Sequence, residues 1–169
     1  MTLHEEPLGR FFEDFEVGDV FRHPLGRTIT EADNTWFTLL TMNTNPMHFD
    51  NEYAERSEFG KSLVASTLTL AIVTGQSVID TSQLAFANLG WDEIRLSAPV
   101  FAGDTLYAES EILVLRESQS RPHAGIVTVR TRGLNQDGVE VVRLKRTFMV
   151  YRRGSDEAKP PFPEPKTPW

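Results

Sequence analysis

The sequence contains no cysteine, and this absence excludes several classes of protein. A secreted domain stapled by disulfides, an enzyme with a thiolate nucleophile and a cysteine-based zinc site all need a residue that the chain does not have. We therefore expect a protein of a reducing compartment, the cytoplasm.

Basic residues are in the minority, because 17 Lys and Arg stand against 24 Asp and Glu and give a net charge of −7. An acidic surface repels phosphate backbones and anionic lipid, so neither nucleic acid nor a membrane surface is expected as the main partner. Long apolar runs are also missing. The longest apolar-leaning stretch, Leu63 to Val73, is too short to span a bilayer. The N-terminal residues lack the basic and apolar regions of a signal peptide.

The 169 residues suffice for one domain with a sizeable core and are too few for two ordinary domains. Five of the ten prolines lie in residues 154–169, where aliphatic side chains are scarce. Such a segment cannot bury enough apolar surface to offset its ordering entropy, so we expect a tail outside the core. Phe162 and Trp169 are its candidate anchors on a partner.

Helical patterns occupy residues 30–80. Thr30 followed by Asp33 is typical of a capping box, and it precedes apolar residues at helical spacing. Residues 66–80 are apolar on nearly every face, which predicts a buried helix. Alternation of apolar and polar residues then predicts strands at 86–96, 104–116, 124–134 and 139–151, with a further strand at 20–29 before the helices.

These elements indicate an α+β fold. A single domain with a curved antiparallel sheet wrapped around the buried central helix accommodates them best, and this arrangement is called the hot-dog fold. We expect core positions for Trp36, Phe37, Phe86 and Trp91 and surface positions for His4, His23 and His123.

Polar residues gather between the two helical regions, in the segment from Asn43 to Asp50. A loop there can hold polar side chains over a rigid scaffold. The imidazole of His48 can pass a proton in either direction, and Asn43 can fold back across the Asn-Pro turn to hold one water beside the ring. In the alternative interpretation, His48 only caps or packs the loop and the asparagines form turn bonds. The residues alone leave both interpretations open.

This segment resembles the hydratase motif of the MaoC-like family of (R)-specific enoyl-CoA hydratases and 3-hydroxyacyl-CoA dehydratases, which reads Asp-x-Asn-Pro-x-His-x-Asp. Asn45, Pro46, His48 and Asp50 match the motif, and Asn43 stands where the family usually has its catalytic aspartate. The segments PVFAGDTL at 99–106 and FFEDFEVGD at 11–19 are similar to two further family segments.

The resemblance covers roughly residues 11–152 and implies a hot-dog domain over that range, usually with two subunits that join their sheets. It also implies a reaction without a cofactor, in which His48 helps activate the water that adds to C3 of a trans-2-enoyl thioester. A backbone N–H at the start of the buried helix, here Ser66, would polarise the thioester carbonyl. Thr74 stands where the family often places a serine hydroxyl, although a threonine within a helix can instead bond its own backbone.

The asparagine at position 43 separates this chain from the usual motif. An amide can orient water but cannot accept a proton, so general-base catalysis would rest on His48 alone. The form Asn-Thr-Asn-Pro-Met-His, with the segment WDEIR at 91–95, resembles hydratases of small branched dicarboxylic acyl-CoAs such as mesaconyl-, methylmalyl- or itaconyl-CoA. The other functions that stay open are a non-catalytic acyl-CoA-binding protein and an acyl-CoA thioesterase.

We expect an acyl-CoA thioester and a second copy of the chain as partners, in a homodimer or a dimer of dimers. The phosphates of CoA call for basic groups at the mouth of the site. The expected substrate-binding residues are Asn45, Asp50, Arg56, Lys61 and Arg95, the last as a candidate for a substrate carboxylate. The alternative for a basic residue on the later strands, Arg146 among them, is a solvated sheet face with cross-strand charge pairs. A metal site is not expected, because His48 and Asp50 supply too few ligands.

Overall fold

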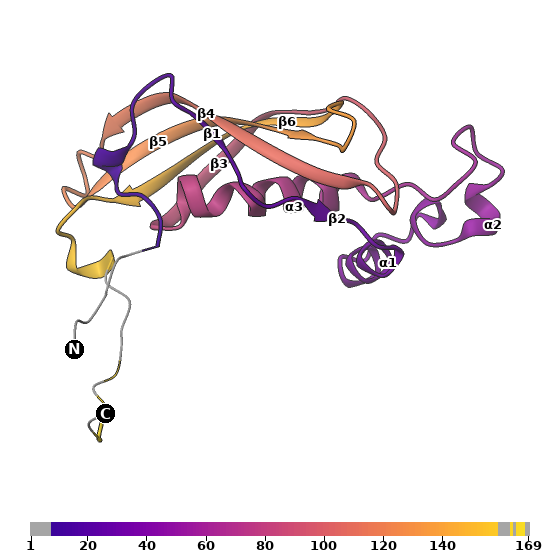
Figure 1. Ribbon diagram of the computed structural model, residues 1–169, viewed down its shortest axis with the longest axis horizontal. Helices are drawn as coiled ribbons and strands as arrows, with labels where there is room; N and C mark the ends of the chain where they lie inside the picture. Colours follow the sequence, from indigo (N-terminus) through magenta and orange to yellow (C-terminus); the bar gives the residue numbers. More distant parts are fainter. Residues whose placement is uncertain (1–7, 159–162, 164, 168–169) are drawn as a thin grey trace.

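A curved antiparallel sheet lies over one long helix (Figure 1). The structure is a computed structural model that describes residues 8–158, 163 and 165–167. The strand order is β1-β4-β5-β6-β3, and β2 also pairs with β4. The strands are β1 Val20–Arg22, β2 Arg27–Thr28, β3 Ala85–Leu96, β4 Thr105–Glu117, β5 Ala124–Leu134 and β6 Glu140–Tyr151. The α-helices are α1 Glu31–Leu40, α2 Asn51–Ala54 and α3 Ser66–Ser77, and shorter helical turns are η1 Phe12–Asp14, η2 Pro46–His48, η3 Val78–Ser82 and η4 Asp156–Ala158.

The predicted meander is confirmed, because β3 to β6 coincide with the four alternating segments to within a few residues. The fifth predicted strand, 20–29, is wrong in its middle, where the chain leaves the sheet between β1 and β2. Pro24 lies in this gap, has no N–H for a ladder and cannot continue the pairing. His23 is 5% exposed, so its expected surface position is wrong. The expected surface position of His123 is confirmed, and His4 lies outside the described residues.

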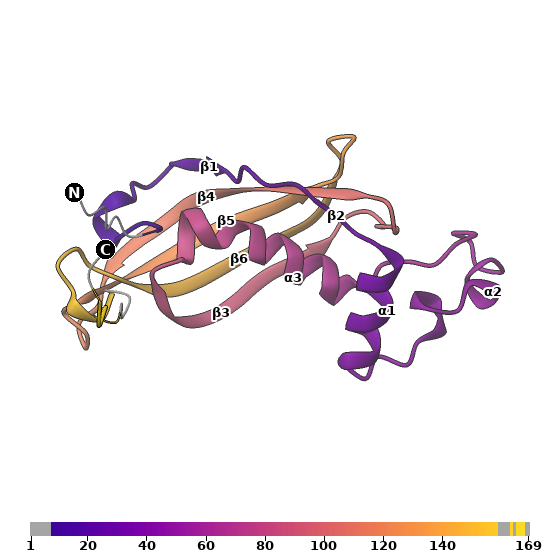
Figure 2. The same ribbon diagram turned by 60° about the horizontal axis from the view of Figure 1, so that its bottom comes forward.

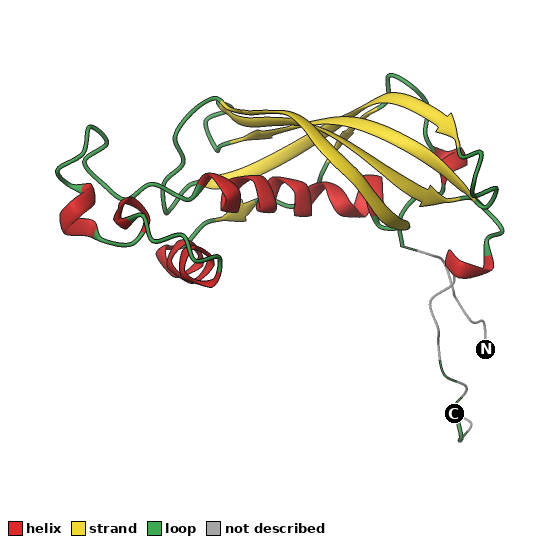
Figure 3. Cartoon of the chain, turned by 180° about the vertical axis from the view of Figure 1, so that it is seen from behind, coloured by secondary structure: helices red, strands yellow, loops and turns green. Residues whose placement is uncertain are grey.

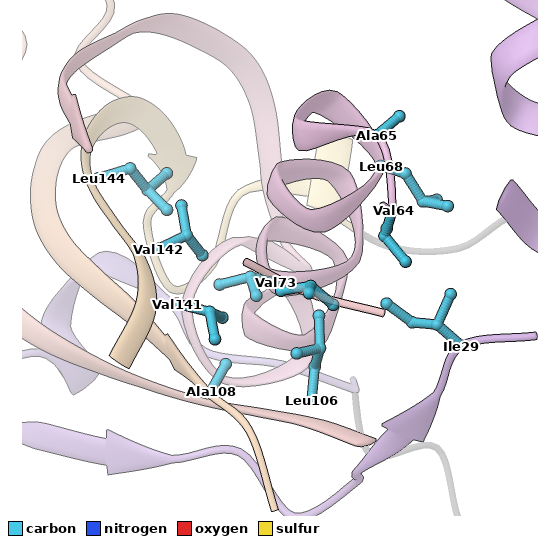
Figure 4. Close-up of a cluster of buried hydrophobic side chains, with 11 residues drawn as sticks. Ile29, Val64, Ala65, Leu68, Val73, Leu106, Ala108, Val141, Val142 and Leu144 are labelled. Atoms are coloured by element: carbon cyan, nitrogen blue, oxygen red, sulfur yellow. The ribbon is translucent and has the colours of Figure 1, made fainter. Parts of the chain in front are cut away.

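The core lies between α3 and the concave face of the sheet (Figures 2 and 4). Val73 of α3 packs with Leu106 of β4 and with Val142 of β6 in one buried cluster. Gly133 of β5 allows this close approach, because a Cβ atom built there would lie 2.5 Å from Val73 Cγ2. A single added methyl group at that position would therefore push the helix off the sheet.

The predicted central helix is confirmed, and α3 is buried on the side that faces the sheet. It packs on β4, β5 and β6, whereas the stripe of Thr67, Ala71 and Gly75 on its other side is exposed. No further layer covers this stripe within the described part of the chain. At 12 residues α3 is short, and no described helix has the length and apolarity needed to cross a membrane.

The helix α1 buries its polar side, opposite to what its apolar spacing suggested. Asn34 and Thr38 are its buried residues, whereas Trp36 is 78% exposed and Leu40 is 82% exposed. The expected core positions of Trp36, Phe86 and Trp91 are therefore wrong. The physical reason is position. Within the described residues, no further layer covers the outer side of α1 or lies beside the edge strand β3.

The predicted capping box of α1 is confirmed. The Thr30 hydroxyl accepts from the Asp33 backbone N–H at 3.1 Å, and the Asp33 carboxylate accepts from the Thr30 N–H at 2.8 Å. The pKa of Asp33 is lowered, first by the hydrogen bond from the Thr30 backbone N–H, then by that from the Thr30 hydroxyl and by the charge of Arg27.

Replacing Thr30 by alanine is expected to cost about 1 kcal/mol of unfolding free energy at neutral pH. Because the folded pKa of Asp33 lies below its unfolded value, the stabilisation is present above the unfolded pKa and is lost as the pH falls through the folded pKa. Urea unfolding at neutral and acidic pH should therefore show a difference between wild type and variant that shrinks in acid. A difference that grows in acid would contradict this account.

The domain limits 11–152 and the tail 154–169 stay predictions. Phe162 and Trp169, the candidate anchors of the tail, lie outside the described residues.

Candidate active site

The polar loop lies at the N-terminal end of α3, beyond the sheet and beside α1 and α2 (Figure 3). Its side chains hold the loop in shape. The Asn43 side-chain oxygen accepts from the Asn45 N–H at 3.2 Å, and the Asn45 side chain caps η2 by accepting from the Met47 N–H at 3.1 Å. Asp50 caps α2 by accepting from the Tyr53 N–H at 3.0 Å. The asparagine turn bonds of the alternative interpretation are therefore present, and they also place His48.

The ring of His48 has a defined orientation. Its Nδ1 lies 2.9 Å from the carbonyl oxygen of Leu63. A carbonyl can only accept, so Nδ1 carries the proton and donates it to this bond. In the neutral ring, Nε2 then presents a lone pair. This nitrogen can accept a proton from water, as a general base does.

A buried amide ties the loop to the start of α3. Asn34, 3% exposed, donates from Nδ2 to the His48 carbonyl at 2.8 Å and to the Leu63 carbonyl at 2.9 Å. Its side-chain oxygen accepts from the Ala65 N–H at 2.8 Å. One side chain of α1 therefore fixes the backbone of His48, the carbonyl that orients its ring and the first residues of α3.

Sequence reasoning missed Asn34. The available signal was a polar residue four positions before Thr38 in a helix whose apolar residues point the other way. Such a pattern predicts a buried polar face only if the helix is known to cover unpaired backbone groups. Here these groups belong to residues that lie 14 to 31 positions further along the chain, so the sequence near Asn34 does not reveal them.

The start of α3 supplies free backbone donors. Ala65 is the N-cap and contributes no side-chain cap, so the Ser66 N–H at the first helical position has no intrahelical partner. The positive end of the helix adds to its attraction for a developing oxyanion. The position expected for Ser66, at a helix start close to the polar loop, is therefore the one observed.

A pocket of about 290 Å³ opens at this helix start. Its lining includes Leu63, Ser66 and Thr69, together with residues 96–100 at the end of β3 and directly after it. Leu63 thus has two roles: it is one of the residues that line the pocket, and its backbone carbonyl holds the His48 ring. The pocket therefore opens at the candidate oxyanion donor Ser66. His48 is not among its lining residues and is linked to it through the carbonyl of Leu63.

Thr74 is not brought to this place within one chain. It lies eight residues beyond Ser66, about 12 Å further along the helix axis. Its hydroxyl oxygen is buried and has no hydrogen-bond partner among the described residues, so it does not bond its own backbone. The catalytic assignment of Thr74 stays a prediction.

The three basic residues expected to bind the substrate, Arg56, Lys61 and Arg95, are all exposed. Lys61 and Arg56 are exposed on the segment from α2 to α3, and Lys61 Nζ lies 3.9 Å from the ring centroid of Phe101. Arg95 is exposed on β3 and donates to the Ile94 carbonyl at 3.0 Å. Among the described residues, no three His, Asp or Glu side chains lie close enough to hold a metal ion.

A second histidine cluster has the geometry of a serine–histidine–aspartate triad without its accessibility. His23 Nδ1 lies 2.9 Å from the Asp80 carboxylate, and its Nε2 lies 2.9 Å from the Ser110 hydroxyl. Ser110 is only 1% exposed and also bonds Thr131 at 2.8 Å. No substrate can reach a nucleophile at that depth, so the cluster holds η3 to the sheet.

A sequence model of the mesaconyl-CoA hydratase family matches residues 3–160. The mesaconyl-CoA hydratase of Cereibacter sphaeroides is 37% identical over 160 residues, which are 95% of this chain and 46% of that protein. The chain thus spans about half the length of the first curated relatives it matches.

The comparison with solved structures gives the same fold. The MaoC-like dehydratase of Rhodospirillum rubrum is 31% identical, with a TM-score of 0.75 over 87% of this chain and 100% of that chain. A protein of Mycobacterium tuberculosis with a double hot-dog fold is 23% identical, with a TM-score of 0.79 over 86% of this chain and 45% of that chain. The predicted α+β hot-dog fold is confirmed.

Proposed function

Because the chain belongs to the mesaconyl-CoA hydratase family, we propose that it catalyses the reversible addition of water to a 2-enoyl-CoA thioester. The single observation that carries the proposal is the His48 ring, held by the Leu63 carbonyl so that Nε2 is free to act as a base. The pocket at the start of α3 offers room for the thioester, and Leu63, whose carbonyl holds the His48 ring, is one of its lining residues.

In the proposed reaction, His48 Nε2 takes a proton from water as the oxygen attacks C3 of the enoyl group. Electron density moves through C2 to the thioester oxygen, where the Ser66 N–H and the helix end stabilise the negative charge. A backbone donor of this kind lowers the barrier by about 3–4 kcal/mol. The proton then passes to C2, so one water has been added across the double bond. Dehydration follows the same path in reverse.

Asn43 is proposed to orient the water. Its side-chain oxygen already accepts from the Asn45 N–H, which leaves the amide N–H groups to donate to the water oxygen. An amide in place of a carboxylate also leaves the site without a negative charge at this position. A substrate with a second carboxylate therefore meets less repulsion here than it would in a site with the usual aspartate.

Restoring the carboxylate with Asn43→Asp is expected to raise kcat for crotonyl-CoA, a simple enoyl ester, by about 10-fold or more, because a second base then shares the proton transfer. An aspartate can keep the bond to the Asn45 N–H, so the loop should hold. The rate is followed as loss of conjugated thioester absorbance. A fall in kcat for crotonyl-CoA would show that the amide is itself needed.

We propose that the chain forms a homodimer in which the edge strands β3 of two copies pair with each other. The edge strand β3 is 12 residues long, and Leu89, Trp91 and Leu96 on it are about half exposed, at 50%, 47% and 47%. A long edge strand with unpaired backbone groups and exposed apolar side chains invites pairing with another strand. Two subunits joined there would form one continuous sheet, of the size of the longer relatives.

One panel of acyl-CoAs tests the function. A hydratase removes the conjugated absorbance of an enoyl-CoA without releasing thiol, whereas a thioesterase releases free CoA thiol. Thermal stabilisation by acyl-CoA without any turnover would indicate a binding protein. Release of thiol, or binding without loss of absorbance on every enoyl-CoA tested, would refute the proposed hydration.

A further inference from the structure

Thr69 is a buried polar residue that the proposed mechanism leaves unused. It lies in α3, is 1% exposed, and is one of the residues that line the pocket at the helix start. Its hydroxyl forms no hydrogen bond with any residue that the structure describes. A buried hydroxyl without a partner is costly, so its presence in the wall of the pocket calls for an explanation.

Other threonines of the helical segments satisfy their hydroxyls locally. Thr38, Thr41 and Thr81 each donate to the carbonyl oxygen four residues earlier, at 2.5 to 2.8 Å. For Thr69 that carbonyl belongs to Ala65, and it accepts from the Thr69 backbone N–H at 3.1 Å but not from the hydroxyl. The hydroxyl of Thr69 therefore remains available to donate to another acceptor.

The hydroxyl of Thr69 is open to the pocket. The unpartnered hydroxyl oxygen of Thr74 is fully buried, whereas that of Thr69 is not, so the small exposed part of Thr69 includes its oxygen. The residues that line the pocket carry no charge, and most of them are apolar. Because such surroundings have a low dielectric constant, a hydrogen bond from Thr69 to a bound molecule would be stronger here than in water.

Thr69 and the free N–H of Ser66 lie one turn apart on the same side of α3. Residues three positions apart in a helix share a face and differ by about 4.5 Å along the axis. The Cα–Cβ bonds of a helix tilt toward its N-terminal end, so the Thr69 side chain lies over the turn that begins at Ser66. The free N–H groups of the first turn point toward the same end. An oxygen atom that accepts from the Ser66 N–H can therefore also accept from the Thr69 hydroxyl.

We propose that the Thr69 hydroxyl donates to the thioester carbonyl oxygen, as the second donor of an oxyanion hole whose first donor is the Ser66 N–H. The inference rests on the proposed function and adds a catalytic residue to it. Negative charge develops on this oxygen as water adds to C3, so the hydrogen bond strengthens in the transition state. The hydroxyl gives up no bond within the protein to make this contact, which keeps it ready for the substrate.

Thr69→Val removes the hydroxyl and nearly keeps the shape of the side chain. We expect kcat for crotonyl-CoA to fall by about 100-fold or more and KM to change by less than about threefold, because the lost bond belongs mainly to the transition state. Thr69→Ser keeps the hydroxyl and should retain most of the wild-type kcat. Thr67→Val is the matched control. Thr67 is exposed, lies outside the pocket lining, and its replacement should leave kcat unchanged.

Stability separates this role from a structural one. The Thr69 hydroxyl has no partner in the described protein, so a methyl group in its place should leave the midpoint of thermal unfolding unchanged or raise it. A hydroxyl that only supported the fold would lose stability and activity together. A destabilised Thr69→Val whose loss of kcat follows its loss of folded protein would overturn the inference.

The carbonyl stretch of bound butyryl-CoA tests the contact without turnover, because this saturated thioester cannot be hydrated. Binding to the wild type should lower the infrared frequency of its isotope-labelled thioester carbonyl, since donors at the oxygen polarise the bond. Thr69→Val should give a smaller shift, and Thr67→Val should give the wild-type shift. An equal shift in Thr69→Val, or an unchanged kcat, would overturn the inference and leave the hydratase function standing. A wild-type chain that hydrates no enoyl-CoA would overturn both.

Discussion

Hydration of crotonyl-CoA is expected to slow by about 100- to 10,000-fold when His48 is replaced by alanine, because the only base in the proposed site is then lost. KM should change little, since the pocket and the start of α3 remain. The rate is measured as loss of conjugated thioester absorbance, and thermal unfolding confirms that the variant is folded.

His48→Asn separates proton transfer from position. An asparagine amide can donate to the Leu63 carbonyl from nearly the place of Nδ1, but it cannot accept a proton. The asparagine variant should therefore be about as slow as the alanine variant. Wild-type kcat in either variant would remove His48 from the mechanism and, with it, the main support for the proposed function.

Replacing Asn34 by aspartate is expected to destabilise the protein by about 2–5 kcal/mol, although the two side chains have the same shape. A carboxylate can still accept from the Ala65 N–H, but it cannot donate to the carbonyls of His48 and Leu63. The His48 carbonyl then loses its side-chain donor, which costs about 1–3 kcal/mol. The buried carboxylate would also face the oxygens of both carbonyls without a hydrogen to share, which adds to the loss. The midpoint of urea unfolding measures the loss.

Asn45→Asp is the matched control for stability. Asn45 is exposed and uses its oxygen to cap η2, a role that aspartate fills equally well, so the unfolding free energy should change by less than about 0.5 kcal/mol. For Asn34→Asp we also expect a fall in kcat beyond that explained by partial unfolding, because the Leu63 carbonyl orients the His48 ring. An Asn34→Asp variant as stable as Asn45→Asp would refute the role of Asn34 in holding the loop to the start of α3.

Local structure could be predicted where neighbouring residues decide it. The capping box of Thr30 and Asp33 needs only three residues of separation, and the strands of the meander need only alternation. The loop from Asn43 to Asp50 was recognised by its motif, and its turn bonds likewise span two or three residues. These features depend on short-range geometry, which the order of the residues specifies directly.

Contacts between distant segments decided the rest. The apolar residues of α1 suggested the wrong buried face, because the helix covers the carbonyls of His48 and Leu63 and needs Asn34 to satisfy them. The alternation of β6 placed Arg146 on a strand, but only the packing of α3 across the sheet removed it from water and gave it the Ser77 hydroxyl as a partner. Periodicity specifies which residues share a face. The tertiary structure determines what that face meets, because burial depends on neighbours that are far away in the chain.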